Sequence, residues 1–254
     1  MAAMSFLGQR HEVSRVVWKG RGLRRSYGVP AKGIRDKGIR HVAIGLWALG
    51  MLMMAPLASA HPHGWVDYTV RVLFDDQGRM TALEQHWKMD PFYSLTLTEE
   101  LARVKDGGSM QQRLDTLGHE IVTNLAREHY LTHVYRGEKE LELGQVTDYT
   151  TMMSDQRMEF FFILPLARPQ APAGNSLRWQ IYDDTYFIEF LYDDKTESPL
   201  TLVDAPKGCS TSVQHADPDP KKVAAASAID MTGNAPAGLG RYFADTGVLE
   251  CRVP

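Results

Sequence analysis

The first sixty residues most constrain what this chain can fold into, because they have the pattern of an export signal. Residues 1–41 hold ten basic residues and two acidic ones, and the stretch 42–60 that follows carries no charge. It ends in Ala58-Ser59-Ala60, the small-x-small pattern that signal peptidase reads. This order of regions predicts a secretory signal peptide, cleaved after Ala60. The fold must then be built from residues 61–254.

The alternative is an uncleaved membrane anchor, since the apolar stretch is nearly long enough to span a bilayer. Pro56 and the small residues after it lie where a cleavage region belongs, and polar sequence follows at once. These features favour cleavage. We therefore expect residues 61–254 to form a single periplasmic domain, with no stable membrane insertion after cleavage.

The net charge of the chain is very different once the predicted leader, residues 1–60, is left out. The whole chain of 254 residues has a net charge of −3, with 44% hydrophobic and 23% charged residues. This ordinary usage excludes a disordered chain, a collagen and a coiled coil. Without residues 1–60, 18 Lys and Arg face 29 Asp and Glu, a net charge of −11. Such an acidic domain has no basic stripe for nucleic acid, so no nucleic-acid partner is expected.

Cys209 and Cys251 are the chain's only cysteines. In an oxidising compartment they predict one disulfide, which would tie the C-terminal tail to the body of the domain. Closing this loop would contribute about 3–4 kcal/mol in the chain-entropy description. The alternative is a thiolate metal site, which needs both sulfurs reduced.

Alternating apolar and polar residues predict a β-rich fold. Residues 65–74 alternate cleanly, and residues 80–89 follow after a turn, with His86 on the face opposite Leu83 and Trp87. Asp90-Pro91 breaks this second strand, and a helix is expected to start near Thr98 as its cap. A second helix is expected over 110–128. The remaining strands are expected at 131–135, 141–153, 157–164, 177–182, 186–192, 200–203 and 247–253.

This order of elements predicts an α+β fold, with a mainly antiparallel, β-sandwich-like core and a helical insertion. Ser154-Asp155-Gln156 is expected to turn one hairpin. The segment 214–240 is rich in Ala, Pro, Asp and Gly without an apolar period. We interpret it as a mobile or partly helical segment.

The residues that follow the cleavage site carry the clearest chemistry. Cleavage would leave His61-Pro62-His63 at the N-terminus. The α-amine and imidazole of His61 can chelate one metal ion, and His63 adds a third nitrogen suited to Zn, Ni, Co or Cu. Pro62 has no amide N–H, so the ion cannot be wrapped through backbone amides. The alternative is a short frayed tail that leads into the first strand.

Other polar pairs give weaker signals. His129 and His133 have metal-ligand spacing for one helix face, but the sequence favours a helix end followed by a strand there. Asp183-Asp184 and Asp193-Asp194 could serve a cation, and the better interpretation is turns between strands. The sequence contains no EF-hand, G-x-S-x-G, Walker, H-E-x-x-H or C-x-x-C motif, and we do not expect an enzyme.

The chain also resembles a known family. The matching runs are residues 60–67, 74–83, 86–94, 124–125 with 130–132, and 182–187, together with the two cysteines. They resemble the periplasmic DUF1007 family, whose members are labelled ABC-type transport components. Members are paired with nickel/cobalt-type permeases of the inner membrane, and a zinc-uptake role is attached to the family. This chain has Asp184 where many members have Pro, and Gly64 where a bulkier residue is expected.

The resemblance implies transition-metal handling in the periplasm. Our first hypothesis is an accessory protein that binds a divalent transition metal (zinc, nickel or cobalt) and assists an inner-membrane permease. Its expected ligands are His61 and His63, with His86, Asp90 and Asp183 as weaker candidates. A second hypothesis is a copper-binding enzyme that uses the N-terminal histidine chelate. A third is a structural β-domain that docks on a membrane partner without metal.

Overall fold

The computed structural model of the protein describes residues 62–104, 108–172, 176–229 and 236–252, which lie in one compact unit. The predicted signal peptide and His61 lie outside the described residues. Within these ranges, no helix is long and apolar enough to cross a membrane.

Eleven strands and three α-helices are described. The strands are β1 (Gly64–Phe74), β2 (Met80–Met89), β3 (Thr132–Arg136), β4 (Lys139–Glu140), β5 (Tyr149–Ser154), β6 (Arg157–Gln170), β7 (Leu177–Ile181), β8 (Ile188–Tyr192), β9 (Leu200–Val203), β10 (Cys209–Gln214) and β11 (Thr246–Cys251). The helices are α2 (Pro91–Arg103), α3 (Met110–Leu125) and α4 (Pro220–Ser227), with 3-10 turns η2 (Ala126–Leu131) and η3 (Gly240–Tyr242).

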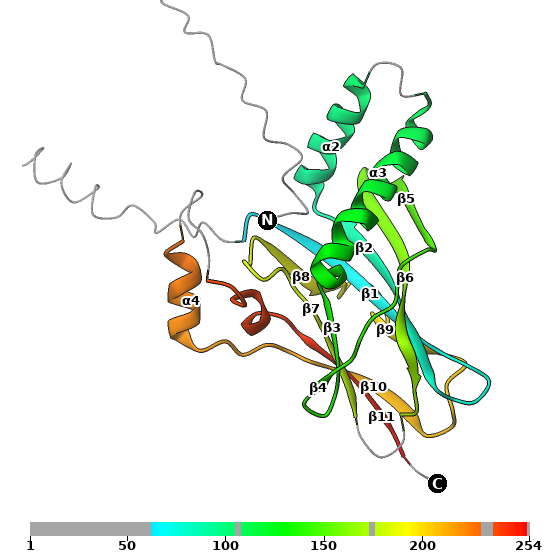
Figure 1. The fold of residues 1–254 in the computed structure, drawn as a ribbon. Helices are drawn as coiled ribbons and strands as arrows, with labels where there is room; N and C mark the ends of the chain where they lie inside the picture. The colour runs from blue at the N-terminus through cyan, green and yellow to red at the C-terminus, as the bar shows by residue number, and fades with distance from the viewer. Residues whose placement is uncertain (1–61, 105–107, 173–175, 230–235, 253–254) are drawn as a thin grey trace, which may run out of the picture. The chain divides into compact units, whose positions relative to one another are not determined.

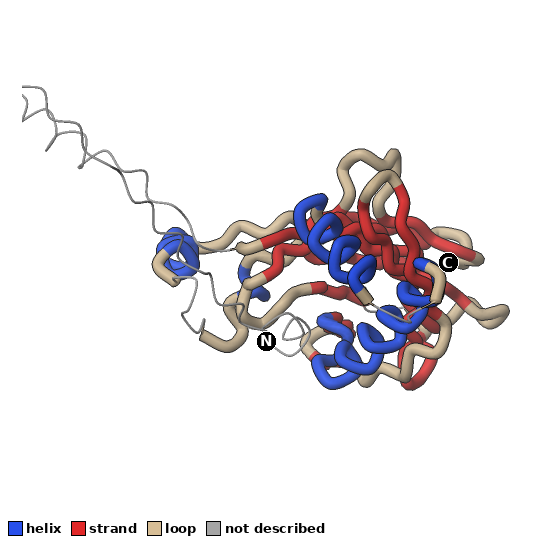
Figure 2. Tube along the Cα trace, turned by 90° about the horizontal axis from the view of Figure 1, so that it is seen from above, coloured by secondary structure: helices blue, strands red, loops and turns tan. Residues whose placement is uncertain are grey.

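The strands form two sheets. Sheet A has the order β5-β6-β2-β1-β8, with β9 also paired to β1, and sheet B has the order β10-β11-β7-β3-β4. The pairings are antiparallel, except that β8 and β9 run parallel to β1. Figures 1 and 2 show α2 and α3 together beside the β5 and β6 edge of sheet A, whereas α4 stands apart from them. The predicted α+β fold with a mainly antiparallel sandwich-like core is confirmed.

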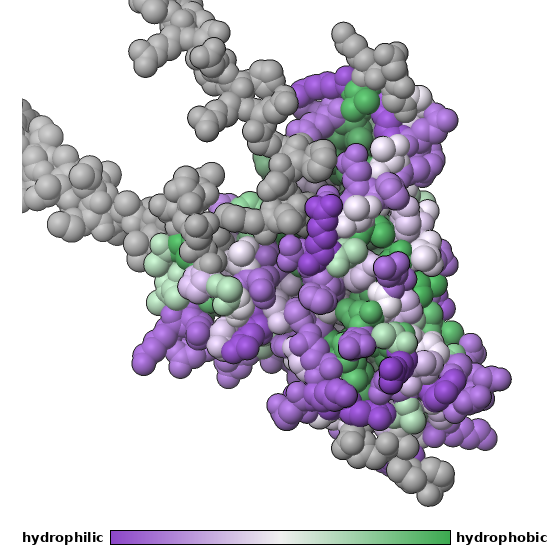
Figure 3. All heavy atoms as spheres, in the orientation of Figure 1, coloured by the Kyte–Doolittle hydropathy of each residue, from purple (hydrophilic) through white to green (hydrophobic). Residues whose placement is uncertain are grey.

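One apolar core joins the two sheets. Phe160 of β6 in sheet A and Trp179 of β7 in sheet B are fully buried, and both belong to a cluster that also includes Leu97 of α2 and Val122 of α3. Along β1 the even-numbered residues 66–74 point into this cluster and the odd-numbered ones do not. On the face seen in Figure 3, hydrophilic residues predominate, and hydrophobic ones show as a broken band beside α3 and β6. Sheet A thus has one core face and one outer face.

The start of the first helix differs from the prediction. Helix α2 begins at Pro91, seven residues before Thr98, and its N-cap is Asp90, whose side chain accepts a hydrogen bond from the N–H of Tyr93. Thr98 lies inside the helix, where its hydroxyl donates to the carbonyl of Ser94. The prediction of a Thr98 cap was wrong, because Asp-Pro both ends the strand and starts the helix: Pro suits the first helical position.

Two predicted strand boundaries also change. The strand expected at 141–153 is wrong: only β5 is regular there, and the preceding residues run irregularly beside β6 through one isolated bridge, Leu143 with Leu166. Strand β6 instead continues to Gln170. The sequence analysis missed β10, whose small polar residues carry little apolar alternation. The segment 214–240 contains α4, and its residues 230–235 lie outside the described part.

Two local predictions are confirmed. Asp155 and Gln156 have φ angles of 48° and 63°, and Ser154 pairs with Arg157, which makes a two-residue hairpin turn between β5 and β6. Cys209 and Cys251 form a disulfide and lie opposite each other in β10 and β11. The disulfide therefore joins the last strand of the chain to its sheet neighbour.

Candidate functional site

Three segments that are far apart in sequence meet where β1 begins. The N–H of His63 donates to the carbonyl of Phe187 over 2.9 Å, and Gly64 is the first residue of β1 to pair with β8. On the other side, the N–H of Asp90 donates to the carbonyl of Trp65 over 3.1 Å. The fold therefore brings His63, Asp90 and the 183–187 turn to one end of sheet A.

His63 is exposed at this end. Its imidazole packs against the ring of Phe187, with 4.5 Å between ring centroids. It also lines a hollow of about 200 Å³ with Trp65, Glu189 and Leu191. An imidazole in such a position can reach a metal ion from solvent.

Glu189 is the carboxylate beside His63, and the sequence analysis missed it. It pairs with Trp65 across the parallel strands and accepts a hydrogen bond from the hydroxyl of Tyr186 over 2.9 Å. Burial, and then the charge of Glu189, raise the pKa of Tyr186, so this hydroxyl stays protonated as a donor. No local pattern could have revealed Glu189, because the pairing of β8 with β1 joins residues more than a hundred positions apart.

Asp90 serves the helix that follows it. Its Oδ1 accepts the N–H of Tyr93 over 2.9 Å and so caps α2. Its Oδ2 faces Gly64: a Cβ on that residue would stand 2.9 Å from this oxygen, closer than real Cβ contacts come. This explains why glycine follows His-Pro-His here, since it lets β1 pass beside the capping carboxylate.

Asp183 is engaged by its own turn. Its carboxylate accepts the N–H and hydroxyl of Thr185 at 2.9–3.0 Å, and the N–H groups of Phe187 and Ile188 at 3.1 and 3.3 Å. The predicted turn is confirmed, and it forms with Asp184 where the resemblance led us to expect Pro. A metal ion at Asp183 would have to compete with these donors.

His86 lies elsewhere on the outer face of sheet A. It pairs with Thr69, six residues along β1 from His63, so the two imidazoles are separated by on the order of 20 Å. Its Nε2 lies 2.9 Å from Glu159, and its ring stacks on Phe161 at 3.8 Å. Burial lowers the pKa of His86, and the charge of Glu159 only partly offsets that. The structure does not bring His86 together with the other candidate ligands.

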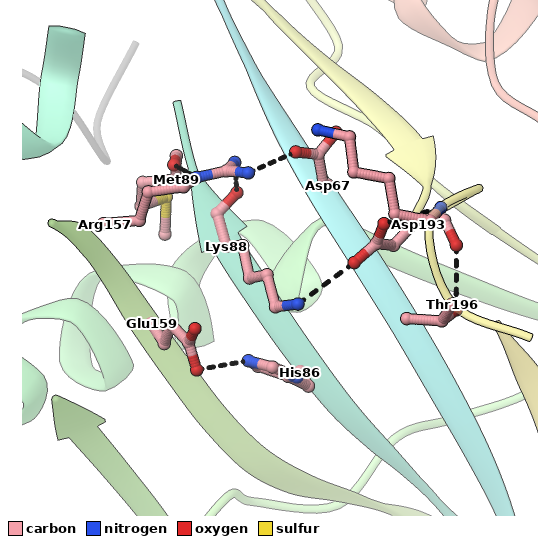
Figure 4. Close-up of polar contacts among 9 residues, drawn as sticks. Asp67, His86, Lys88, Met89, Arg157, Glu159, Asp193 and Thr196 are labelled. Atoms are coloured by element: carbon pink, nitrogen blue, oxygen red, sulfur yellow. Dashed lines mark hydrogen bonds and ion pairs between the residues drawn. The ribbon is translucent and has the colours of Figure 1, made fainter. Parts of the chain in front are cut away.

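The outer face beside His86 carries a row of ion pairs (Figure 4). Arg157 contacts Asp67 at 2.6 Å and donates to the carbonyls of Lys88 and Met89. Lys88 contacts Asp193 at 3.1 Å. Burial alone would raise the pKa of Asp193, but the Lys88 ammonium and a backbone N–H bring it below its ordinary value. Both carboxylates are therefore neutralised by cations.

The pair His129 and His133 does not share a helix face. His133 lies in β3, as predicted, with Nδ1 2.8 Å from Glu140 and its ring stacked on Tyr182. His129 lies in η2 with a φ angle of 50°. Across the described ranges, no three His, Cys, Asp or Glu side chains are grouped as a metal site. The described residues therefore place one carboxylate, Glu189, beside His63 and group no third ligand with them.

Side chains in the run from Trp87 to Ser94 make buried hydrogen bonds near the same end of sheet A. The indole N–H of Trp87 donates to Gln85, whose amide donates to Thr132 of β3, linking the two sheets through buried groups. Ser94 donates to the carbonyl of Asp90 and accepts the N–H of Met158 over 3.0 Å. These motif residues fix β2, α2 and β6 relative to one another.

Comparison with known families places most of the chain in one family. The profile described as "Protein of unknown function (DUF1007)" matches residues 46–251. The chain belongs to the DUF1007 family. One relative, an uncharacterised protein of Haemophilus influenzae, is 24% identical over 195 residues, covering 76% of this chain and 91% of its own.

A second relative, an uncharacterised 15.5 kDa protein encoded in the trpE 3′ region of Spirochaeta aurantia, is 32% identical over 85 residues. That match covers 34% of this chain and 60% of the relative. Neither description names an activity. The family resemblance drawn from the sequence is thereby confirmed at the level of the family itself.

Proposed function

We propose that this chain binds a divalent transition metal (zinc, nickel or cobalt) at the His63 end of sheet A, and hands it to an inner-membrane permease from the periplasm. The observation that carries the proposal is the exposed imidazole of His63, which lies beside Glu189 in a hollow and follows His61 by two residues. Imidazole and amine nitrogens with one carboxylate are a ligand set that these ions accept.

The ligands would be His61, through its amine and ring, together with His63 and Glu189. Asp183 and Asp90 support the site indirectly, because their oxygens hold the turn before β8 and the start of α2. A site at the chain's end with an open face lets the ion exchange, as delivery requires. The net charge of −11 after cleavage would raise the local concentration of cations.

The first experiment measures metal affinity on the exported protein, after mass spectrometry has established its N-terminal residue. Zinc, nickel and cobalt are titrated against the wild type, His61→Ala and His63→Ala. We expect each alanine variant to lose at least about tenfold in affinity, since even outer-shell changes cost that much. His119→Ala is the matched control, because His119 is an exposed histidine on α3 that contacts Tyr149. Equal affinities in the wild type and both variants would sink the proposal.

The second experiment concerns delivery. Uptake of the bound metal is measured in cells that carry the permease, with wild type, His63→Ala or no accessory protein. We expect His63→Ala to behave like the deletion at low external metal, because the ion is no longer held at the exposed site. Unchanged uptake in the deletion strain would refute the accessory role, whatever the affinity measured in solution.

A further inference from the structure

Exposed apolar side chains gather around His63. Large apolar residues exposed in the described part of the chain number nine, and five of them lie at this end of sheet A. Phe92 and Leu95 of α2 are 78% and 57% exposed. The five are Trp65, Phe92, Leu95, Phe187 and Leu191, and we call this set the His63 face.

The five residues lie on the three segments that meet where β1 begins. Trp65 and Leu191 line the hollow with His63, and the ring of Phe187 packs on its imidazole. Phe92 and Leu95 are three residues apart on one side of α2 and therefore adjacent. They follow Asp90, whose N–H is bonded to the carbonyl of Trp65. The face thus spans the starts of β1, α2 and β8.

Folding does not account for this exposure. The other side of α2 already buries Ser94 and Leu97 against the core, so Phe92 and Leu95 lie on the side that should be polar. Contiguous apolar surface with a polar rim is typical of interaction sites. Aromatic residues are enriched at the centres of such sites.

The segments that build the face carry more acidic than basic residues. Residues 62–67, 90–103 and 183–193, which build this end, hold eight acids against a single base, Arg103. The acids are Asp67, Asp90, Glu99, Glu100, Asp183, Asp184, Glu189 and Asp193. Arg103, Lys88 and Arg157 each pair with one of them. Asp90 and Asp183 are buried and accept hydrogen bonds from their own helix and turn. The accessible charge that favours a cationic occupant is therefore that of Glu100, Asp184 and Glu189.

We propose that the His63 face is the docking surface for a second protein whose own contact surface is apolar and ringed by Lys and Arg. A second copy of this chain would place the same acids opposite each other, which is repulsive. A bilayer with anionic lipids would be repelled for the same reason. This inference rests on the proposed function, because docking would bring the metal held at His63 to the partner. The contact between the two proteins does not itself require the metal.

The test places a photo-crosslinking amino acid at Phe92 and, separately, at Leu191, in cells that export the full protein. Met152 of β5 and Val223 of α4 are the control positions, because they are 40% and 43% exposed and lie outside the face. We expect both face positions to crosslink the same protein, at an apolar segment flanked by Lys or Arg, and the controls not to. Crosslinks to lipid, to a second copy, to a segment without basic residues, or no stronger than the controls would overturn the proposal.

A charge reversal separates docking from metal binding. Glu99→Lys with Glu100→Lys reverses part of the rim on the exposed side of α2, and costs the fold little because the Glu99–Arg103 pair is exposed. We expect this variant to lose the crosslink and keep its metal affinity. His63→Ala, or added chelator, should lose the metal and keep the crosslink. A crosslink unaffected by the charge reversal would refute the acidic rim as the docking determinant.

Discussion

Replacing Asp90 tests whether this motif carboxylate supports the fold or binds metal. Its Oδ1 caps α2 through the N–H of Tyr93, and its residue is only 6% exposed. Asp90→Ala removes the cap and leaves that N–H without its partner. Lost N-caps cost about 1–2 kcal/mol of unfolding free energy. For a domain of this size we expect the melting temperature to fall by about 2–8 °C.

The matched control is Asp90→Ser, which keeps a capping oxygen and removes the carboxylate. We expect its unfolding free energy to stay within about 0.5 kcal/mol of wild type, since Ser and Asp cap nearly equally well. Urea denaturation of the metal-free protein measures both variants, and zinc titration follows on the same samples. The reasoning is refuted if Asp90→Ser is as unstable as Asp90→Ala. A metal affinity lost in Asp90→Ser at full stability would instead make Asp90 a ligand.

Three further changes test the core, the outer face and the disulfide. Gln85→Leu should cost about 1–3 kcal/mol in urea denaturation, because it leaves the buried indole N–H of Trp87 without its acceptor, whereas Thr132 keeps its hydrogen bond to the carbonyl of Tyr130. His86 has a pKa lowered from 6.5 by burial, so the unfolded chain takes up its proton first. Stability should therefore fall as the pH drops below about 6.5, and His86→Gln should flatten that slope across unfolding midpoints from pH 5 to 8. Reducing the Cys209–Cys251 disulfide should cost about 4 kcal/mol, for a loop closed over 42 residues, measured with and without reductant.

Local patterns predicted the parts of the fold that local interactions build. The alternation in residues 65–74 and 80–89 predicted β1 and β2 at nearly their observed bounds, because each strand has one core face and one outer face. The hairpin turn at Asp155 was also predicted from local sequence, because antiparallel neighbours such as β5 and β6 can be joined by a loop of only two residues. The start of α2 was missed although its signal was present, in the form of Asp-Pro before an apolar run.

Pairings between distant strands were beyond local patterns. The sequence of residues 188–192 does not predict that they run parallel to β1. A parallel pairing depends on where the chain returns after a long crossover, which no local pattern encodes. That pairing determines what surrounds His63: it brings in Glu189, Phe187 and Leu191 together. The sequence therefore offered His63 as a candidate ligand and missed the residues that surround it.

An aspartate or glutamate side chain can hold a turn, cap a helix or bind a metal ion. Sequence spacing alone therefore could not show which acidic candidate is the best metal ligand. What ranks them is how many donors each carboxylate already accepts. Asp183 accepts the backbone N–H groups of Phe187 and Ile188, at the start of β8, and both the N–H and the hydroxyl of Thr185. Glu189 accepts one hydroxyl within the described ranges and lies on the exposed side of its strand. Asp90 also accepts one donor, the N–H of Tyr93, but it is only 6% exposed. Glu189 would therefore be a more accessible oxygen ligand for a cation at His63 than Asp90, and would give up fewer donors than Asp183.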